Sequence, residues 1–179
     1  MRIISGTFKG RQLFTPKDLS VRPTTDKVRN AVFSVLFDAV EGAHVLDLFC
    51  GTGSYGIEAI SRGADKAVFV DTDVTFVKKN IRDMEDSTDV IKGDVTKILP
   101  TISGKFDIIF IDPPYGKYAP AELLGMIADG GLLADGGTIV FEESFRSPFD
   151  VANTDFFIEN EKKYGDTKIY YIASGGGDK

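Results

Sequence analysis

From about Val45 onward, short apolar runs alternate with amphipathic stretches along the chain. Each apolar run has the length of a strand. The run at 106–111 is almost continuously apolar, which is typical of a strand covered on both faces in a parallel sheet. The pattern predicts five such strands, at 44–48, 66–71, 89–92, 106–111 and 137–142.

The stretches between these runs have the spacing of helices. The predicted helices span 53–62, 74 to about 84 with Asp73 as N-cap, and about 120 to 129. Strands that alternate with helices predict a doubly wound α/β sheet. The runs 156–163 and 168–173 break the alternation. The link between them, 164–167, is so short that it predicts an antiparallel hairpin.

The first 24 residues precede this alternation. Glycines at 6 and 10 and prolines at 16 and 23 predict a small hairpin or arm there. A helix capped by Thr25 or Asp26 is expected to run to about Val40, with an apolar stripe that includes Ala39. The predicted organisation is an N-terminal arm or hairpin at 1–24, one main domain at 25–174 and a disordered tail at 175–179.

The composition fits one soluble domain. The chain has 179 residues, of which 42% are hydrophobic and 27% are charged. The single cysteine, Cys50, excludes an intrachain disulfide, and the single histidine, His44, excludes a zinc site of clustered Cys and His. No apolar run approaches the roughly 18 residues of a membrane span, and the first residues lack the apolar stretch of a signal peptide. We therefore expect a cytoplasmic protein that holds no metal.

Charge is distributed unevenly along the chain. The net charge is −6, but the first 30 residues hold seven basic against two acidic side chains, which gives +5 there and −11 for the other 149 residues. A basic arm on an acidic body indicates a polyanionic partner, although a solvated terminus can have the same composition. The candidate phosphate contacts are Arg2, Lys9, Arg11, Arg22 and Arg29.

A glycine-rich loop joins the first predicted strand to the helix that follows it. Gly51, Gly53 and Gly56 have the G-x-G-x-x-G spacing, and Asp71 follows Gly51 by twenty residues. Such loops hold ligands at the carboxyl end of a strand, and the acid can bind ribose hydroxyls. Dinucleotides and S-adenosylmethionine share this pattern. The candidate cofactor-binding residues are Asp47, Phe49, Gly51, Thr52, Gly53, Asp71, Thr72, Asp94 and Val95.

The carboxylate of Asp47 favours S-adenosylmethionine as the cofactor. At the end of the strand it would repel a pyrophosphate and attract a sulfonium and an ammonium, a difference of several kcal/mol at about 4 Å. The alternative is that Asp47 caps a turn and the glycines only allow a helix to pack. Asp94 either accepts a hydrogen bond from an adenine amino group or lies in a plain turn. Cys50 has no basic partner nearby in sequence and is interpreted as a small turn residue.

The fourth predicted strand ends in Asp112-Pro113-Pro114-Tyr115, the most specific motif of the chain. Two prolines stiffen the backbone and remove two donors, while their carbonyls remain acceptors. The Asp112 carboxylate and the Pro113 carbonyl could each accept one N–H of a planar amine, so that its lone pair is freed for reaction. Tyr115 could stack on a base taken out of its helix or loop. The alternative is a rigid turn that closes the strand.

Residues 47–53 and 112–115 resemble the cofactor loop and catalytic motif of class I amino-methyltransferases. The resemblance is closest to RsmD-type bacterial 16S rRNA guanine-N2 methyltransferases. It is carried by residues 1–6, 9–11, 22–29, 45–56, 61–64 and 164–167. It implies a Rossmann-like sheet of seven strands with an antiparallel C-terminal strand, S-adenosylmethionine as donor, and the N2 amine of one guanine in 16S rRNA as target. It also implies that the basic arm contacts RNA in the small ribosomal subunit or its assembly intermediate, without a membrane or a metal, and that the protein acts as a monomer.

Two departures from the family pattern are mild. Cys50 and the pair Ser54-Tyr55 replace smaller or more apolar residues, and the net charge of −6 is low for an RNA enzyme, which predicts salt-sensitive binding. Three other functions stay open at this point. They are an NAD-dependent oxidoreductase, a non-catalytic RNA-binding assembly factor, and a methyltransferase for another amino group such as adenine N6 or a glutamine amide.

Overall fold

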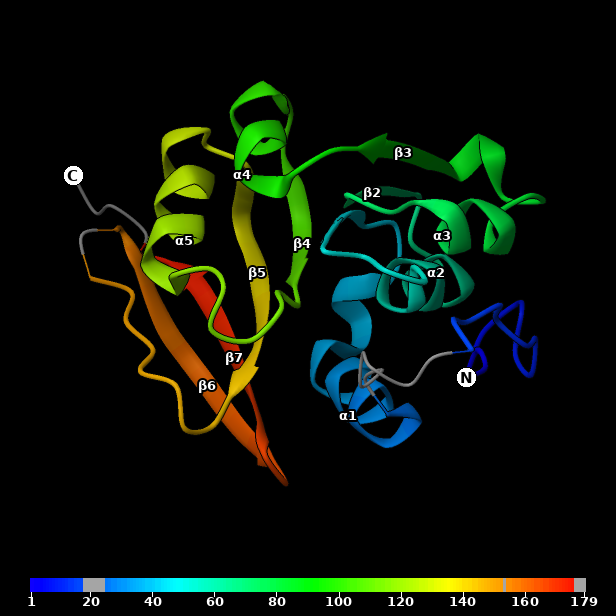
Figure 1. The fold of residues 1–179 in the computed structure, drawn as a ribbon, viewed down its shortest axis with the longest axis horizontal. Coiled ribbons are helices and arrows are strands. Elements are labelled where there is room, and N and C mark those ends of the chain that lie inside the picture. Colours follow the sequence, from blue (N-terminus) through cyan, green and yellow to red (C-terminus); the bar gives the residue numbers. More distant parts are fainter. Residues whose placement is uncertain (18–24, 153, 176–179) are drawn as a thin grey trace.

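The computed structural model, which describes residues 1–17, 25–152 and 154–175, contains a seven-stranded sheet with helices on both faces (Figure 1). The elements are α1 (Asp26–Leu36), the 3-10 helix η1 (Phe37–Val40), β1 (His44–Leu48), α2 (Ser54–Ser61), β2 (Lys66–Asp71), α3 (Thr75–Asn80), η2 (Glu85–Ser87), β3 (Thr88–Lys92), α4 (Val95–Ile98), η3 (Leu99–Thr101), β4 (Phe106–Ile111), α5 (Pro120–Asp129), β5 (Leu133–Ser144), β6 (Phe156–Tyr164) and β7 (Thr167–Ser174). The strands lie in the order β3-β2-β1-β4-β5-β7-β6.

The sheet is mostly parallel, as predicted. Neighbouring strands from β3 to β5 are parallel, whereas β7 is antiparallel to both β5 and β6. The seven strands and the antiparallel C-terminal strand implied by the resemblance are therefore confirmed. The order of the strands reverses between β1 and β4, and ligands of open α/β sheets bind at such reversals.

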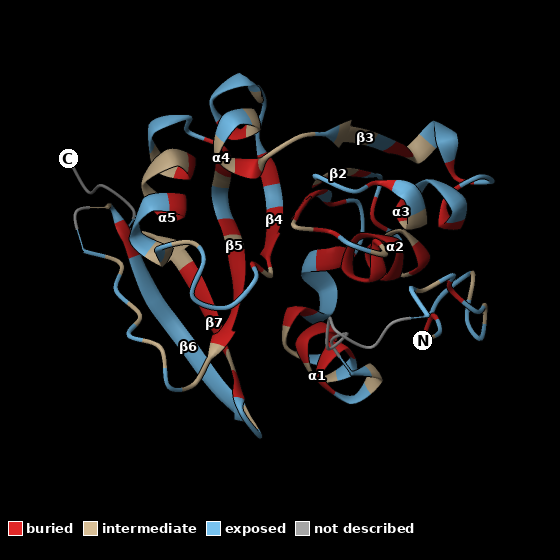
Figure 2. Ribbon diagram, in the orientation of Figure 1, coloured by how far each residue is buried: buried red, intermediate tan, exposed pale blue. Residues whose placement is uncertain are grey.

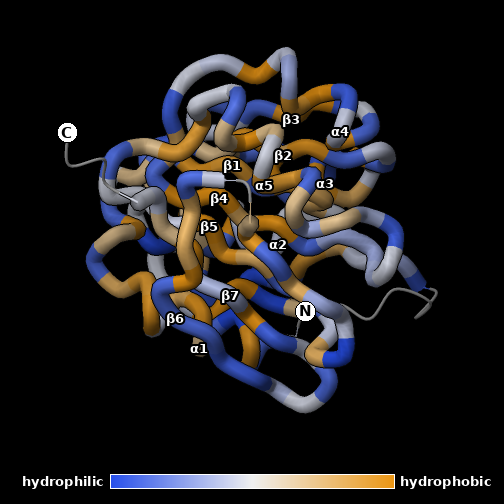
Figure 3. The backbone as a smooth tube through the Cα atoms, turned by 90° about the vertical axis from the view of Figure 1, so that its left-hand side faces the viewer, coloured by the Kyte–Doolittle hydropathy of each residue, from blue (hydrophilic) through white to orange (hydrophobic). Residues whose placement is uncertain are grey.

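Two apolar layers cover the sheet because successive side chains of each strand face opposite sides. On one face, Val45 and Phe110 pack with α1, α2 and α3. On the other face, Leu46 and Ile109 pack with α4 and α5. Figure 3 shows the central strands as the most hydrophobic part of the backbone, enclosed by more hydrophilic segments.

The described part of the N-terminal arm, residues 1–17, forms a small hairpin on α2. Arg2 and Gln12 form an antiparallel bridge, and Leu13 N–H donates to the carbonyl of Met1 at 3.1 Å. Gly6 lies so close to α2 that a Cβ would stand 1.6 Å from the carbonyl oxygen of Ser61. Over these residues the segment turns back on itself, and it is docked on the domain by backbone contact.

Helix α1 is shorter than predicted. It ends at Leu36, and Phe37 has a φ of 39°, from which a 3-10 turn leads to Val40. The turn brings Val40 into the core but leaves Ala39 exposed. Apolar residues at helical spacing therefore continue past the end of the helix. The prediction that Ala39 lies on the buried stripe was wrong.

Helix α3 is also shorter than predicted. It begins at Thr75, with Val74 in the cap position, and the Asp73 carboxylate accepts from Thr75 N–H at 2.9 Å. It ends at Asn80, although Met84 is still buried by the turn that follows. The helix was predicted too long because Met84 is buried at the spacing of a helix although the backbone there makes no α-helical hydrogen bonds.

Two further segments differ from the sequence prediction. β5 starts at Leu133 and not at 137, because the Asp135-Gly136-Gly137 stretch, which looks like a turn, lies within the strand at a register shift against β4. The four-residue helix α4 was not predicted, because so short a segment has no periodic signal.

Strand β6 forms one edge of the sheet and is exposed along most of its length, as Figure 2 shows by its pale blue colour. The strands next to it in the sheet, β7 and β5, are largely buried. In the described ranges, the longest helices are too short or too polar to cross a membrane.

Candidate active site

The predicted cofactor loop, residues 49–53, and the predicted catalytic corner, residues 112–115, lie side by side at the carboxyl edge of the sheet. Leu48 and Ile111, the last residues of β1 and β4, are paired, and Asp112 N–H donates to the Leu48 carbonyl at 3.5 Å. This is the point where the order of the strands reverses. Two motifs separated by about sixty residues in the sequence thus meet where ligands bind in this class of sheet.

The cofactor loop is a tight turn with three residues at positive φ, namely Phe49 at 59°, Gly51 at 53° and Gly53 at 79°. A non-glycine residue in this region is strained by roughly 1–3 kcal/mol. The ring of Phe49 is held against that of Tyr118, with ring centroids 4.8 Å apart. Gly53 N–H donates to the Cys50 carbonyl at 2.7 Å and closes the turn. The buried Cys50 is a structural residue of this turn.

Gly56 allows α2 to pack directly on the sheet. A Cβ at this position would lie 2.4 Å from the ring of Phe69 and 3.2 Å from Asp47 Oδ2. The Gly56 N–H donates to the same carboxylate oxygen at 2.9 Å. The third glycine of the motif therefore fixes the start of α2 beside the Asp47 carboxylate.

Replacing Gly56 with alanine is expected to destabilise the protein by roughly 1–3 kcal/mol, because the Phe69 ring cannot move out of a packed core without strain. The matched control is Gly125→Ala. Gly125 lies in α5 with nothing within 4 Å of its Cβ position, so this change should stabilise by about 0.5–1 kcal/mol. Chemical unfolding of both variants measures the difference. Equal effects of the two substitutions would contradict the close packing at Gly56.

Asp47 is a buried carboxylate, 2% exposed, at the base of the cofactor loop. Burial raises the pKa of Asp47 to about 7, and the charge of Asp71 acts in the same direction, whereas the Gly56 hydrogen bond lowers it. Within the described part of the chain, no cation forms an ion pair with Asp47. A cationic ligand beside this carboxyl group would favour its charged form.

The two other predicted carboxylates lie at the ends of the neighbouring strands β2 and β3, with Asp71 as the last residue of β2 and Asp94 two residues after β3. Asp71 Oδ2 accepts from Gly51 N–H at 2.8 Å, so this carboxylate holds the cofactor loop. Asp94 caps α4, accepting from the N–H and hydroxyl of Thr96 at 3.0 Å and 2.6 Å and from the Tyr118 hydroxyl at 3.4 Å. The hydroxyl of Thr96 lowers the pKa of Asp94, which favours its charged form.

Thr72 and Val95 follow these carboxylates in the sequence. The Thr72 hydroxyl donates to Asp71 Oδ1 at 3.3 Å, and Val95 is buried as the first residue of α4. Both residues therefore lie at the carboxyl edge of the sheet, where the sequence predicts that the cofactor binds.

The catalytic corner combines a rigid backbone with an exposed aromatic face. Pro113 is buried, while Pro114 is exposed and its carbonyl accepts from Lys117 N–H at 3.2 Å. Tyr115 is 50% exposed, and its hydroxyl lies 3.0 Å from Thr167 Oγ1 at the start of β7. Partial burial raises the pKa of Tyr115. The tyrosine is neutral near pH 7, and one end of its ring is anchored.

Sequence reasoning missed two buried carboxylates at the end of β5. Glu142 accepts from the Tyr55 hydroxyl at 3.2 Å, and Glu143 accepts from the N–H of Ser144 at 2.7 Å. Tyr55, which departs from the family pattern, is buried and stacks on Phe110 with ring centroids 4.7 Å apart. The sequence contained one signal for them, which is a pair of acidic residues directly after the apolar run of a predicted strand.

The predicted basic residues of the arm differ in their exposure and in their ion pairs, and so in how readily they could bind a phosphate. Arg2 and Lys9 are exposed, and Arg2 lies 3.8 Å from Asp26. Arg11 forms a 2.7 Å ion pair with Asp83. The prediction for Arg22 concerns a position outside the described residues.

Arg29 is not a phosphate contact, contrary to the sequence prediction. It is 0% exposed, and its guanidinium donates to the Arg2 carbonyl and to Asp26, and lies 3.6 Å from the Glu58 carboxylate. Glu58 also accepts from Ile4 N–H at 2.8 Å. Arg29 and Glu58 thus form a buried pair that fixes the arm to α1 and α2.

Asn80, at the end of α3, joins the arm to the cofactor loop. Its amide group bonds both backbone groups of Phe14, at 2.7 Å and 3.1 Å, and donates to the Thr52 carbonyl at 2.9 Å. The Thr52 hydroxyl also reaches Met1 Sδ at 3.6 Å. The basic arm therefore lies against the loop predicted to hold the cofactor.

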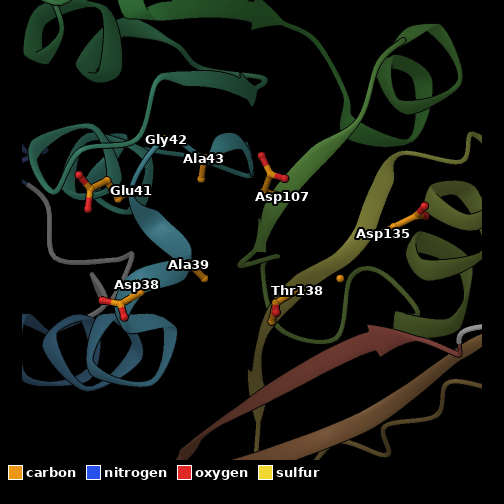
Figure 4. Close-up of a pocket in the computed structure, with 9 residues that line it drawn as sticks. Asp38, Ala39, Glu41, Gly42, Ala43, Asp107, Asp135 and Thr138 are labelled. Atoms are coloured by element: carbon orange, nitrogen blue, oxygen red, sulfur yellow. The ribbon is translucent and has the colours of Figure 1, made fainter.

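A shallow hollow of about 280 Å³ lies at the opposite, amino edge of the sheet (Figure 4). Its lining includes Asp38, Glu41, Asp107 and Asp135. Asp107 is already bonded to His44 N–H at 2.8 Å. None of the predicted functional residues lines this hollow, so it carries no part of the candidate site.

Comparisons with known proteins agree with this arrangement. The family described as conserved hypothetical protein 95 matches residues 1–173. The chain is 35% identical to the YlbH protein of Bacillus subtilis (strain 168) over 98% of this chain and 100% of that protein. It is 30% identical to ribosomal RNA small subunit methyltransferase D of Escherichia coli (strain K12), over 92% and 85%. The solved structure of yhhF from Escherichia coli covers 97% of both chains with a TM-score of 0.86 at 29% identity.

Proposed function

The chain belongs to the conserved hypothetical protein 95 family and is a relative of ribosomal RNA small subunit methyltransferase D, and from this we propose that it transfers a methyl group from S-adenosylmethionine to the exocyclic N2 amine of one guanine in 16S rRNA. The observation that carries the proposal is the contact between β1 and β4. There the Asp112 corner meets the glycine loop.

The charges of the site fit a cationic cofactor better than a dinucleotide. Asp47 lies near the end of β1, Asp71 is the last residue of β2 and Asp94 follows β3, so the three lie on neighbouring strands at the same edge. Across the described residues, none of the three takes part in an ion pair. A pyrophosphate would meet three acidic side chains there, and repulsion from its charge would disfavour binding. This arrangement argues against the NAD-dependent oxidoreductase that the glycine spacing alone allowed.

The same residues would hold S-adenosylmethionine. Asp47, Asp71 and Asp94 would contribute carboxylates, and the strained loop that includes Phe49 and Gly51 would contribute backbone groups. When bound, the cofactor supplies a methyl group made electrophilic by its sulfonium. Nothing lies within 4 Å of the Cβ position of Gly51, so there is open space beside its backbone for the cofactor.

The corner would prepare the amine of the base. The Asp112 carboxylate and the Pro113 carbonyl would each accept one N–H, which holds the nitrogen and frees its lone pair. Among the described residues, no donor bonds the Pro113 carbonyl, whereas that of Pro114 is used within the turn. The exposed face of Tyr115 would stack on the base. This catalysis works by positioning and electrostatics.

The arm would supply the first contacts to RNA. Arg2 and Lys9 are predicted phosphate contacts that are exposed, and Arg11 could exchange Asp83 for a phosphate. A net charge of −6 makes binding depend on such local contacts, so affinity should fall steeply with salt. The substrate would be 16S rRNA in the small ribosomal subunit or its assembly intermediate, which places the reaction in the cytoplasm.

The decisive experiment is transfer of a labelled methyl group to free 16S rRNA, small ribosomal subunits and DNA, followed by digestion to nucleosides. We expect label in N2-methylguanosine from a ribosomal substrate and none in DNA. Label in N6-methyladenine would move the activity to another amino target. Binding of rRNA without transfer to any of the three would identify a non-catalytic assembly factor instead.

A further inference from the structure

A second group of basic side chains lies on the other side of the catalytic corner from the arm. It consists of Arg146 and Lys163, which flank the ring of Phe145, with Lys168 beside them, and is termed the hairpin patch. The ammonium of Lys163 lies 3.5 Å from the Phe145 ring centroid, and the Arg146 guanidinium lies 5.3 Å from it. Arg146 and Lys163 are exposed, and the ring is half-buried.

The patch is fixed at the same edge of the sheet as the corner. Ser144, the last residue of β5, pairs with Thr167, the first residue of β7. Phe145 N–H then donates to the Asp166 carbonyl in the β6–β7 turn at 3.0 Å. Figure 1 shows this turn beyond the ends of β4 and β5, at the bottom of the view.

A direct contact connects the β6–β7 hairpin, which carries Lys163 and Lys168, to the corner. The Tyr115 hydroxyl lies 3.0 Å from Thr167 Oγ1, and Thr167 is adjacent to Lys168 in sequence. A base stacked on Tyr115 would therefore have its neighbouring phosphates within reach of the hairpin. The sheet order supports this view. The arm is docked on α2, which packs against β1 and β2, and β4 separates these strands from β5, β7 and β6.

The positive charges of the patch reduce the stability of the hairpin. Lys163 and Lys168 are directly opposite each other on β6 and β7, and like charges in this position destabilise a strand pair. Glu161 forms a 2.7 Å ion pair with Lys168. In the described ranges, neither Lys163 nor Arg146 has a carboxylate partner.

The acidic groups near the patch do not neutralise these two cations. Glu143 is buried and accepts from the N–H of Ser144 and the hydroxyl of Ser147, at 2.7 Å and 3.2 Å. Asp166 is exposed in the turn, where its backbone carbonyl binds Phe145. Two cations held over one ring are suited to a partner that supplies several negative charges.

We propose that the hairpin patch is a second RNA-binding surface, which holds the phosphate backbone next to the target base while the N-terminal arm holds it on the other side. This inference rests on the proposed function. The two basic surfaces would bracket the corner and position the substrate without reading its sequence. It also explains how an acidic protein can hold a long polyanion.

The test compares two double variants with the unchanged protein. Arg146→Gln with Lys163→Gln removes two charges from the patch. Lys66→Gln with Lys105→Gln removes two charges at the amino edge. Binding of transcribed 16S rRNA is measured over a salt series, and methyl transfer to the same RNA gives KM and kcat. Affinity for S-adenosylhomocysteine and thermal melting report on the fold.

The patch variant, which loses two charges, is expected to flatten the slope of log affinity against log salt by roughly 1.4, since each phosphate contact on a single strand contributes about 0.7. Its KM for RNA should rise at least tenfold with a smaller change in kcat, while the amino-edge variant behaves like the unchanged protein. The charge-preserving pair Arg146→Lys with Lys163→Arg should keep the slope. An unaltered slope and KM in the patch variant would overturn the inference.

Failure of the proposed function has a different signature. If the unchanged protein binds rRNA but transfers no methyl group, the function is wrong while the salt series still tests the patch. If the unchanged protein methylates rRNA and the patch variant does so with the same KM, only the patch is wrong.

Discussion

The Asp112→Ala variant is expected to lose methyl transfer by roughly 10²- to 10³-fold while it binds S-adenosylhomocysteine as well as the unchanged protein does. Loss of one preorganised hydrogen-bonding group at a reacting centre typically has an effect of this size. Asp112 directly follows β4, whereas the residues proposed for the cofactor lie at the carboxyl ends of β1, β2 and β3. Single-turnover transfer from labelled donor and calorimetry with S-adenosylhomocysteine measure the two properties separately.

Asp112→Asn is the matched control for this prediction. Its amide oxygen can still accept one N–H of the target amine, but without a negative charge, so activity should lie between those of the alanine variant and the unchanged protein. Full activity in the alanine variant would remove Asp112 from the mechanism. Equal loss of cofactor affinity and of transfer would make it a cofactor-binding residue instead.

Asp47→Asn is expected to make the protein more stable above pH 7 and weaker in cofactor binding. With a folded pKa of about 7 against 3.8 for an ordinary carboxyl, the native state binds more protons than the unfolded chain between these values. Stability of the unchanged protein therefore falls as pH rises through this window and then levels off. The gap sets a ceiling of about 4 kcal/mol for the gain. The measured gain should be smaller, because an NH2 group replaces an oxygen.

Urea unfolding at pH 5 and pH 8 measures this gain. The difference in unfolding free energy between the variant and the unchanged protein should grow from the lower to the higher pH, because asparagine does not titrate. Its oxygen can still accept from Gly56 N–H, so the fold should persist. A difference that does not depend on pH would mean that Asp47 is fully charged in the native state. Unchanged affinity for S-adenosylhomocysteine would remove it from the cofactor site.

The alternation of apolar runs predicted the strands that matter for the site. β1, β2 and β4 have the predicted bounds because buried parallel strands need continuous apolar residues, and these are visible without any partner. The adjacency of Asp47 and Asp112 was not visible as a pattern. It depends on β4 inserting next to β1, which the α/β class and the family resemblance implied.

Other features depend on contacts that no local pattern contains. Arg29 was predicted to face RNA because a sequence shows charge but not burial, and its partner Glu58 lies on another helix. Glu142 was missed because its partner Tyr55 is 87 residues away. The positive φ of Phe49 could not be predicted, since aromatic residues rarely adopt it.

The open edge of β6 also affects how the protein behaves at high concentration. An edge strand exposes unpaired backbone groups that can template pairing with another copy, and charged side chains along it discourage this aggregation. Glu159, Glu161, Lys162 and Lys163 are charged residues of β6, which also exposes the apolar side chains of Phe157 and Ile158. Lys163, which we assign to substrate binding, therefore also protects solubility, and an apolar residue in its place would favour edge-to-edge association of copies.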